Sequence, residues 1–243
     1  MECCTVVTGA ASGIGYAVVQ KLLAKGARVV AVDLNGERLH ERLGDNQNVT
    51  CIACDLTNAE GFKLITDGIK AQYLGVKGFV HAAGFDRVAP LGMINAEAVA
   101  QLVSIHATFP IQFLGWMAKK NNHVDGAASV LISSLSTHEG AKGHVAYAAA
   151  KGAVEGLLKP AAAELAPKGI RLNAVVLGVV QTEMSQGWIS KLTPDQFASI
   201  SAGYPMGLGK PSDVANAIAF LLSADSSWIT GQTLVCDGGH GVA

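Results

Sequence analysis

The chain has 243 residues, of which half are hydrophobic and 15% are charged, and its formal net charge is −1. That length is enough for one well-buried α/β core, and the few scattered basic residues argue against a nucleic-acid partner. No uninterrupted apolar run reaches the ~18 residues that a membrane span needs, and no basic leader with a cleavage site precedes the first expected strand. We therefore expect a cytoplasmic protein with no membrane partner.

The five cysteines are an odd number with apolar neighbours, so we expect reduced, buried thiols rather than disulfides. Cys51 and Cys54 have the spacing of a redox motif. They fall in an expected strand, however, where positions three apart face opposite sides of the sheet. Structural cysteines are therefore favoured over redox chemistry, and we expect no metal site.

Short runs rich in valine and isoleucine alternate with helical patterns along the chain. The strand-like runs lie at residues 4–7, 28–32, 49–53, 78–81, 129–132, 170–176 and 233–236, and the helical patterns at 14–25, 36–43, 59–70, 95–120, 145–166 and 211–223. Strands that read as continuous apolar runs are buried on both faces, so the alternation predicts a doubly wound parallel sheet between two layers of helices. One domain should span 1–243, with the stretch 179–210 as a substrate lid.

Residues 8–15, with the sequence TGAASGIG, link the first expected strand to the first expected helix. Glycines in such a turn let the backbone approach a pyrophosphate, whose charge the helix N-terminus stabilises. Asp33 closes the second expected strand, near the position where an acidic residue binds a ribose. Together these features favour a dinucleotide site over a mere tight turn.

Asp33 also bears on the choice of cofactor. A carboxylate can accept hydrogen bonds from both ribose hydroxyls, and it would repel a 2′-phosphate by a few kcal/mol at an effective dielectric of about 20. Leu34 and Asn35 follow the acid, and the glycine turn contains no arginine. These residues favour NAD(H) over NADP(H), unless Asp33 is an ordinary solvated residue at a strand end.

Tyr147 and Lys151 are four residues apart and would lie one turn apart on the same face of a helix. An ammonium beside a phenol lowers the tyrosine pKa, and a tyrosine tuned in this way can exchange a proton with an alcohol or ketone oxygen. Ser134, at the end of a buried apolar run, could hold the same oxygen. The pair alone occurs by chance in many helices, so its interpretation depends on the rest of the chain.

The glycine turn, Asp33, Ser134, Tyr147 and Lys151 together resemble the short-chain dehydrogenase/reductase (SDR) family. The resemblance covers essentially the whole chain. Further segments that resemble the family in order and spacing are 55–57 (DLT), 81–84 (HAAG), 170–175 (IRLNAV), 178–182 (GVVQT), 229–232 (ITGQ) and 237–239 (DGG). The resemblance implies a Rossmann-type fold, an oxidoreductase and a homo-oligomer, most commonly a tetramer and otherwise a dimer.

By position, the resemblance assigns Tyr147 as the general acid/base and Ser134 as the hydrogen-bond partner of the reacting oxygen. Lys151 would lower the tyrosine pKa and bind the nicotinamide ribose. Asp55 would contact adenine, or else belong to the cap region of the following helix. The full set of implied cofactor contacts is Gly9, Ser12, Gly13, Ile14, Gly15, Asp33, Leu34, Asp55, Leu56, Ala82, Ala83, Gly84, Tyr147, Lys151, Gly178, Val180 and Thr182.

Three residues depart from the family pattern. His106 stands where the family usually has an asparagine that helps to hold a water in a proton relay. It would either take over that role, since imidazole both donates and accepts hydrogen bonds, or be an ordinary core residue. Leu177 replaces the usual proline before Gly178. Pro160 lies inside the helix that follows Lys151 and should kink it, in a helix that the family uses at subunit interfaces.

The main functional hypothesis is an NAD(H)-dependent oxidoreductase that interconverts a secondary alcohol and a ketone. A 3-oxoacyl/3-hydroxyacyl group is the first expected substrate, and a sugar, polyol or small hydroxy-ketone is the second. If the acyl group were held on a carrier protein, basic surface residues such as Lys119, Lys120 and Lys168 would dock the acidic helix of that protein. A non-catalytic NAD-binding sensor or assembly protein is the alternative from another class. The expected substrate contacts are Leu135, Ser136, His138, Gly140, His144, Met184 and Trp188.

Overall fold

In the computed structural model, which describes residues 2–242, seven parallel strands form one sheet in the order β3-β2-β1-β4-β5-β6-β7. Their bounds are β1 Cys4–Thr8, β2 Val29–Asp33, β3 Val49–Ala53, β4 Val76–His81, β5 His123–Ser134, β6 Arg171–Leu177 and β7 Thr233–Cys236. The strand order reverses between β1 and β4, and open α/β sheets bind ligands beyond the carboxyl ends of the strands at such a point. The predicted doubly wound α/β fold is confirmed.

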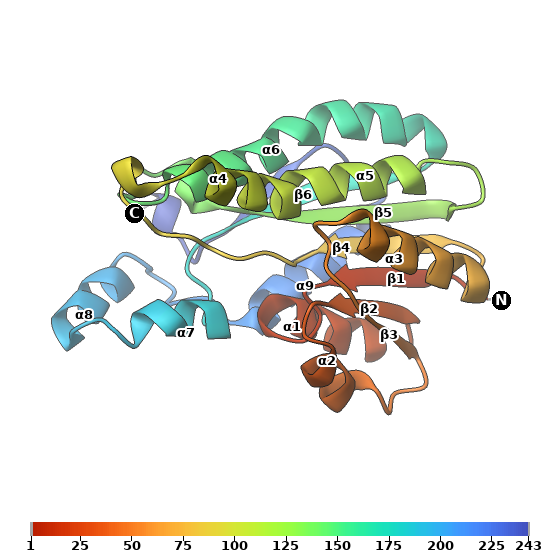
Figure 1. The fold of residues 1–243 in the computed structure, drawn as a ribbon, viewed down its shortest axis with the longest axis horizontal. Helices are drawn as coiled ribbons and strands as arrows, with labels where there is room; N and C mark the ends of the chain where they lie inside the picture. Colours follow the sequence, from red (N-terminus) through yellow and green to blue (C-terminus); the bar gives the residue numbers. More distant parts are fainter. Residues whose placement is uncertain (1, 243) are drawn as a thin grey trace.

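Helices cover both faces of the sheet (Figure 1). One face carries α1 (Gly13–Leu23), α2 (Gly36–Leu43) and α9 (Pro211–Leu222), whose apolar residues share one buried cluster. The opposite face carries α3 (Ala59–Gln72), α4 (Ala96–Val103), α5 (Phe109–Met117) and α6 (Val145–Leu165). The sheet therefore has a hydrophobic core on each side, as its continuous apolar strands require.

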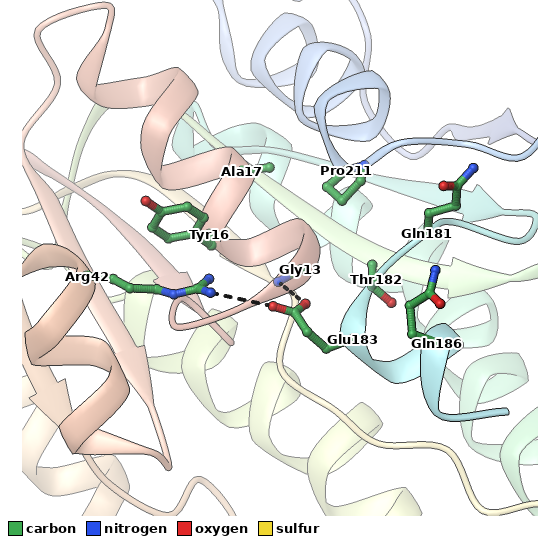
Figure 2. A pocket seen from close by; sticks show the side chains of 9 residues that line it. All are labelled: Gly13, Tyr16, Ala17, Arg42, Gln181, Thr182, Glu183, Gln186 and Pro211. Atoms are coloured by element: carbon green, nitrogen blue, oxygen red, sulfur yellow. Dashed lines mark hydrogen bonds and ion pairs between the residues drawn. The ribbon is translucent and has the colours of Figure 1, made fainter. Parts of the chain in front are cut away.

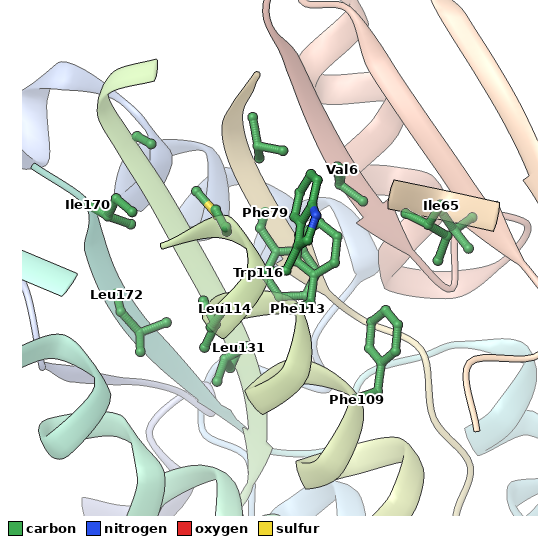
Figure 3. Close-up of a cluster of buried hydrophobic side chains, with 14 of the residues drawn as sticks. Val6, Ile65, Phe79, Phe109, Phe113, Leu114, Trp116, Leu131, Ile170 and Leu172 are labelled. Atoms are coloured by element: carbon green, nitrogen blue, oxygen red, sulfur yellow. The ribbon is translucent and has the colours of Figure 1, made fainter. Parts of the chain in front are cut away.

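Aromatic side chains fix α5 to the sheet (Figure 3). The ring centroids of Phe79 in β4 and Phe113 in α5 are 4.4 Å apart, and Trp116 lies 5.4 Å from Phe113. Phe109 stacks on Phe113 at 6.0 Å. Aromatic pairs at these separations stabilise a core by more than their buried area alone provides. The segment just before α5, which carries His106, is thereby held in place.

The predicted helix over 95–120 is interrupted by one π-helical turn, Ser104–Thr108, between α4 and α5. Pro110 explains the interruption, because it lacks an N–H and its ring would clash with the carbonyl four residues earlier, that of His106. Single π turns inside helices occur frequently at functional sites. The turn changes the direction in which His106 points relative to a regular helix.

The expected lid, residues 179–210, contains two short helices, α7 (Glu183–Ile189) and α8 (Pro194–Ala202). Thr182 and Thr193 begin them with capping boxes, in which each side chain and a residue three positions later exchange hydrogen bonds. Figure 1 shows this segment standing out from the layers of the domain. Elsewhere, α6 continues through Pro160 without ending there.

The segment Ala96–Met117 is long and apolar enough to cross a bilayer by length and composition, with a mean hydropathy of 1.2. Half of its most apolar window is buried inside the fold. The aromatic contacts with β4 account for that burial, so its hydrophobicity serves the core of the domain.

The five cysteines are free thiols, but only Cys4 is buried, and the other four are partly buried rather than buried as expected. Burial raises the pKa of Cys4 to about 12 and that of Cys54 to about 11. Because the thiolate is the reactive form of cysteine, both are poor nucleophiles at neutral pH. Their structural interpretation agrees with these surroundings.

Candidate active site

The three residues expected to carry the chemistry come together at the carboxyl end of β5. Ser134 is the last residue of that strand, and Tyr147 and Lys151 lie in the first two turns of α6. The ammonium of Lys151 is 5.6 Å from the centre of the Tyr147 ring and donates a hydrogen bond to the carbonyl of Ile132 at 2.9 Å. The oxygen of Ser134 accepts a hydrogen bond from the Ser136 amide at 3.2 Å, which leaves its hydroxyl proton free to donate.

Burial governs the protonation of this group. It lowers the pKa of Lys151 to about 7, against an opposing effect of the Asp86 carboxylate. Burial also raises the pKa of Tyr147 above its ordinary value, Asp86 raises it further, and the Ser134 hydroxyl acts to lower it. The pKa of Tyr147 is therefore raised overall, because the cost of burying a phenolate outweighs the hydrogen bond from Ser134, and a lowering by Lys151 stays a prediction.

His106 packs edge-on against Tyr147, with ring centroids 5.5 Å apart. Its Nε2 is 3.0 Å from the carbonyl oxygen of Phe85, which can only accept, so Nε2 carries the proton and Nδ1 is left as an acceptor. Nδ1 is buried and has no hydrogen-bond partner within residues 2–242. Burial, aided by the charge of Lys151, lowers the pKa of His106 to about 2. The ring is thus a neutral acceptor beside the tyrosine.

A second buried histidine, His81, connects two parts of the site. Its Nδ1 is 2.9 Å from the hydroxyl of Thr8 at the end of β1, and its Nε2 donates to the carbonyl of Ile105 in the π turn at 2.8 Å. The Thr8 oxygen also accepts from the amide of Ala83 at 3.2 Å. Burial lowers the pKa of His81 to about 3, so the ring is neutral, as this pattern of donors requires. Sequence reasoning did not predict this bridge.

The glycine turn is built for close backbone approach. Gly9 has φ +68°, and a Cβ there would lie 2.8 Å from the carbonyl oxygen of Ala82. A Cβ on Gly15 would lie 2.1 Å from the carbonyl oxygen of Gly9, so only glycine fits. The Asp33 carboxylate accepts hydrogen bonds from the amides of Ala11 and Asn35, each at 2.9 Å. These amides hold Asp33 beside the turn, where the ribose-binding role requires it.

An anionic side chain already binds at the N-terminus of α1. One oxygen of Glu183, from the lid helix α7, accepts a hydrogen bond from the Gly13 amide at 3.0 Å (Figure 2). Arg38 pairs with the other oxygen, and Arg42 lies 3.8 Å from it. Gly13, Arg42 and Glu183 line a cavity of about 550 Å³ together with Thr182. Because a carboxylate binds to the turn in this way, the residues fit the pyrophosphate of a dinucleotide.

The other residues expected along the cofactor follow the carboxyl ends of several strands. Leu34 is exposed directly after β2, and Ala82, Ala83 and Gly84 come directly after β4. Ser12 and Ile14 lie at the start of α1, and Gly178 and Val180 follow β6.

The residues that follow β3 have their own local contacts. Asp55 accepts hydrogen bonds from the amide and hydroxyl of Thr57 at 2.8 and 2.7 Å, whereas Asn58 caps the next helix. Leu56 is buried. Asp55 is therefore not the cap residue, and its contact with adenine stays a prediction.

The expected substrate residues lie in three places: beside Tyr147, beside Glu155 and on α7. His144 packs edge-on against Tyr147 with ring centroids 6.4 Å apart, and Leu135 is buried in the turn after Ser134. His138 is instead half-exposed and lies 3.1 Å from Glu155 of α6. Met184 and Trp188 are on α7, where Met184 is half-exposed. Sequence reasoning missed Asp86, whose carboxylate lies 3.6 Å from His144.

Comparisons with known proteins match nearly the whole chain. A family model described as Enoyl-(Acyl carrier protein) reductase matches residues 9–241. The chain is 31% identical to the 3-oxoacyl-[acyl-carrier-protein] reductase FabG of Vibrio cholerae, over 96% of this chain and 95% of that protein. It is 32% identical to the D-threitol dehydrogenase of Mycolicibacterium smegmatis, over 97% and 91%.

Solved structures agree with these matches. A 4-hydroxyisoleucine dehydrogenase complexed with NADH superposes with a TM-score of 0.92, at 25% identity and with all of both chains covered. Its bound dinucleotide is consistent with the fit of the glycine turn, Asp33 and the α1 N-terminus in this structure. The chain therefore belongs to the short-chain dehydrogenase/reductase family, as an enzyme that acts on CH–OH groups and interconverts alcohols and ketones with a nicotinamide cofactor.

Proposed function

We propose that the enzyme uses NAD(H) and that Tyr147 is the general acid/base for the interconversion of a secondary alcohol and a ketone. The observation that carries this proposal is the meeting of Ser134, Tyr147 and Lys151 at the carboxyl end of β5. The Ser134 hydroxyl donates to the reacting oxygen, and Tyr147 gives a proton to the ketone oxygen or takes one from the alcohol. When bound, the nicotinamide ring takes up or supplies the hydride.

Lys151 and His106 act on the proton of Tyr147. The Lys151 ammonium would bind the ribose of the cofactor and favour the phenolate, in opposition to burial. The neutral His106 offers Nδ1 as an acceptor and so takes the place of the relay asparagine. NADH turnover on a panel of 3-oxoacyl esters, ketoses and small hydroxy-ketones tests the proposal. Binding of NADH without turnover of any of them would favour a non-catalytic sensor instead.

The preference for NAD(H) rests on Asp33, which two backbone amides hold beside the glycine turn. NADH should bind at least about 50-fold more tightly than NADPH, because the carboxylate accepts ribose hydroxyls and repels a 2′-phosphate. Asp33→Ala should narrow the ratio to below about fivefold, measured by fluorescence titration with both cofactors. The exposed Asp45→Ala is the control and should keep the wild-type ratio. Equal affinities in the unmutated enzyme would rule out this role of Asp33.

Glu183 competes with the cofactor for the Gly13 amide, so the lid helix α7 must release this contact before a pyrophosphate binds. Glu183→Gln should lower the Kd for NADH by about threefold to tenfold, since a partly exposed ion pair contributes about 1 kcal/mol. Fluorescence titration measures the change, and Glu164→Gln on the exposed side of α6 is the matched control. Weaker binding by Glu183→Gln would mean that the carboxylate assists the cofactor instead.

We also propose a cytoplasmic homo-oligomer, most simply a tetramer. Four large apolar side chains in the stretch from α9 to β7 are exposed, and contact with another copy of the chain would remove them from water. They are Phe220, Trp228, Leu234 and Val235. Light scattering tests the assembly, and a particle of 25.0 kDa, the mass of one chain, would contradict it.

A further inference from the structure

Only one of the two carboxylate oxygens of Asp86 lies near a polar partner in the described part of the chain. The residue lies in the segment after β4, and its side chain is 21% exposed. Its Oδ2 is 3.6 Å from Nε2 of His144, whereas Oδ1 is buried and has no hydrogen-bond partner in the described part of the chain. Leaving a buried acceptor unpaired costs about 1–3 kcal/mol, and more when the group is charged. A fold that keeps such an oxygen needs a compensating partner.

The position of Asp86 indicates what that partner is. Its charge acts on both Tyr147 and Lys151, so the carboxylate lies within electrostatic reach of the phenol that handles the reacting oxygen. His144, which faces Asp86, also packs against the ring of Tyr147. These contacts join Asp86, His144 and Tyr147 into one group beside the proposed reaction centre.

We propose that Asp86 recognises a hydroxyl group on the carbon adjacent to the reacting carbon of the substrate. This inference rests on the proposed role of Tyr147. An ionised carboxylate only accepts hydrogen bonds, so it pairs with a donor and is left unpaired by an alkyl group. It repels a carboxylate or phosphate on the substrate. The charge of Lys151 offsets its own, so a neutral donor is sufficient.

The inference selects between the two substrate classes that the sequence left open. A vicinal diol or its hydroxy-ketone supplies the donor directly beside the reacting carbon. A 3-oxoacyl group carries only hydrocarbon carbons beside the reacting one and its acyl carbonyl one carbon further, and none of these can donate to Asp86. The polyol or hydroxy-ketone, the second expectation from the sequence, is thus the favoured class.

The matched substrate pair 1,2-propanediol and 2-butanol tests this recognition, because the two differ only by a hydroxyl in place of a methyl group. With NAD⁺ in excess, the unmutated enzyme should oxidise the diol with a kcat/KM at least about 100-fold higher, since 2-butanol leaves the carboxylate unpaired. Asp86→Ala should bring this ratio within about threefold of one. Asp86→Asn keeps one acceptor oxygen and should give an intermediate ratio.

Asp125→Asn makes the same change at an exposed position in β5 and should keep the full ratio. NADH titration of each variant checks that the fold and the cofactor site are intact, and the nearly isosteric Asp86→Asn serves if Asp86→Ala does not fold. A wild-type ratio near one, or an unchanged ratio in both Asp86 variants, overturns the proposal. Absence of turnover with every alcohol and ketone would instead count against the proposed function itself.

Discussion

Replacing Tyr147 with phenylalanine should lower kcat for ketone reduction at least about 10³-fold, because the variant keeps the ring but loses the proton donor. Positioned acid–base catalysis contributes about 10² to 10⁴ to a rate, and Tyr147 packs against both Lys151 and His106. The affinity for NADH should change by less than about threefold. Steady-state NADH oxidation and fluorescence titration measure the two quantities.

Tyr73→Phe is the matched control for that experiment. Its hydroxyl, 2.8 Å from that of Thr50 near the start of β3, lies at the end of α3 and not at the carboxyl end of β5 that carries the site. The control should lose about 1 kcal/mol of stability and keep its kcat. Full activity of Tyr147→Phe would refute the assigned acid/base and leave Ser134 or His106 to supply the proton.

Lys151→Met should inactivate the enzyme while making its fold more stable at pH 7. The lysine pKa is about 7 in the folded protein and about 10.5 in the unfolded chain. Between these values the unfolded chain binds a proton that the folded protein has lost, so wild-type stability rises with pH over this range. At pH 7 the buried charge costs up to about 4 kcal/mol, and methionine removes that cost.

Urea denaturation should show the variant to be more stable by about 1–3 kcal/mol at pH 7, after the loss of the hydrogen bond to Ile132. The advantage should shrink as the pH rises towards and above 10.5, where the wild-type lysine becomes neutral in both states. We expect kcat to fall at least about 100-fold at pH 7. A variant that is less stable at pH 7 than the wild type would show that Lys151 is not held at an energetic cost.

Much of the fold could be predicted because its signals are local. Continuous apolar strands and periodic helices specify the parallel sheet without any knowledge of long-range contacts. The π turn was missed although its signal is in the sequence, since Pro110 sits four residues after His106 inside a helical pattern. The lid helices were missed because they are short, and only the capping pattern that begins at Thr182 marks the first of them.

Part of the candidate site could likewise be predicted from local sequence signals, and part could not. The glycine turn and the pair Tyr147 and Lys151 are recognisable from their spacing along the chain, which does not depend on the residues that pack around them. Asp86 and Glu183 could not be found by that route, because their significance comes from residues distant in the chain. Glu183 reaches Gly13 across 170 positions, and Asp86 acquires its role only when the start of α6 packs beside it. Such contacts exist only in the folded chain.

The two buried imidazoles determine how pH measurements on this enzyme are to be interpreted. His81 and His106 stay neutral in the folded protein down to about pH 3 and about pH 2, whereas an unfolded histidine takes up a proton near pH 6.5. Acidification below pH 6.5 therefore destabilises the fold through these two rings. Lys151, with a pKa of about 7, should instead lose the ammonium that favours the phenolate as the pH rises through neutrality, so we expect alkaline inactivation and acid unfolding to have separate origins in the same cluster.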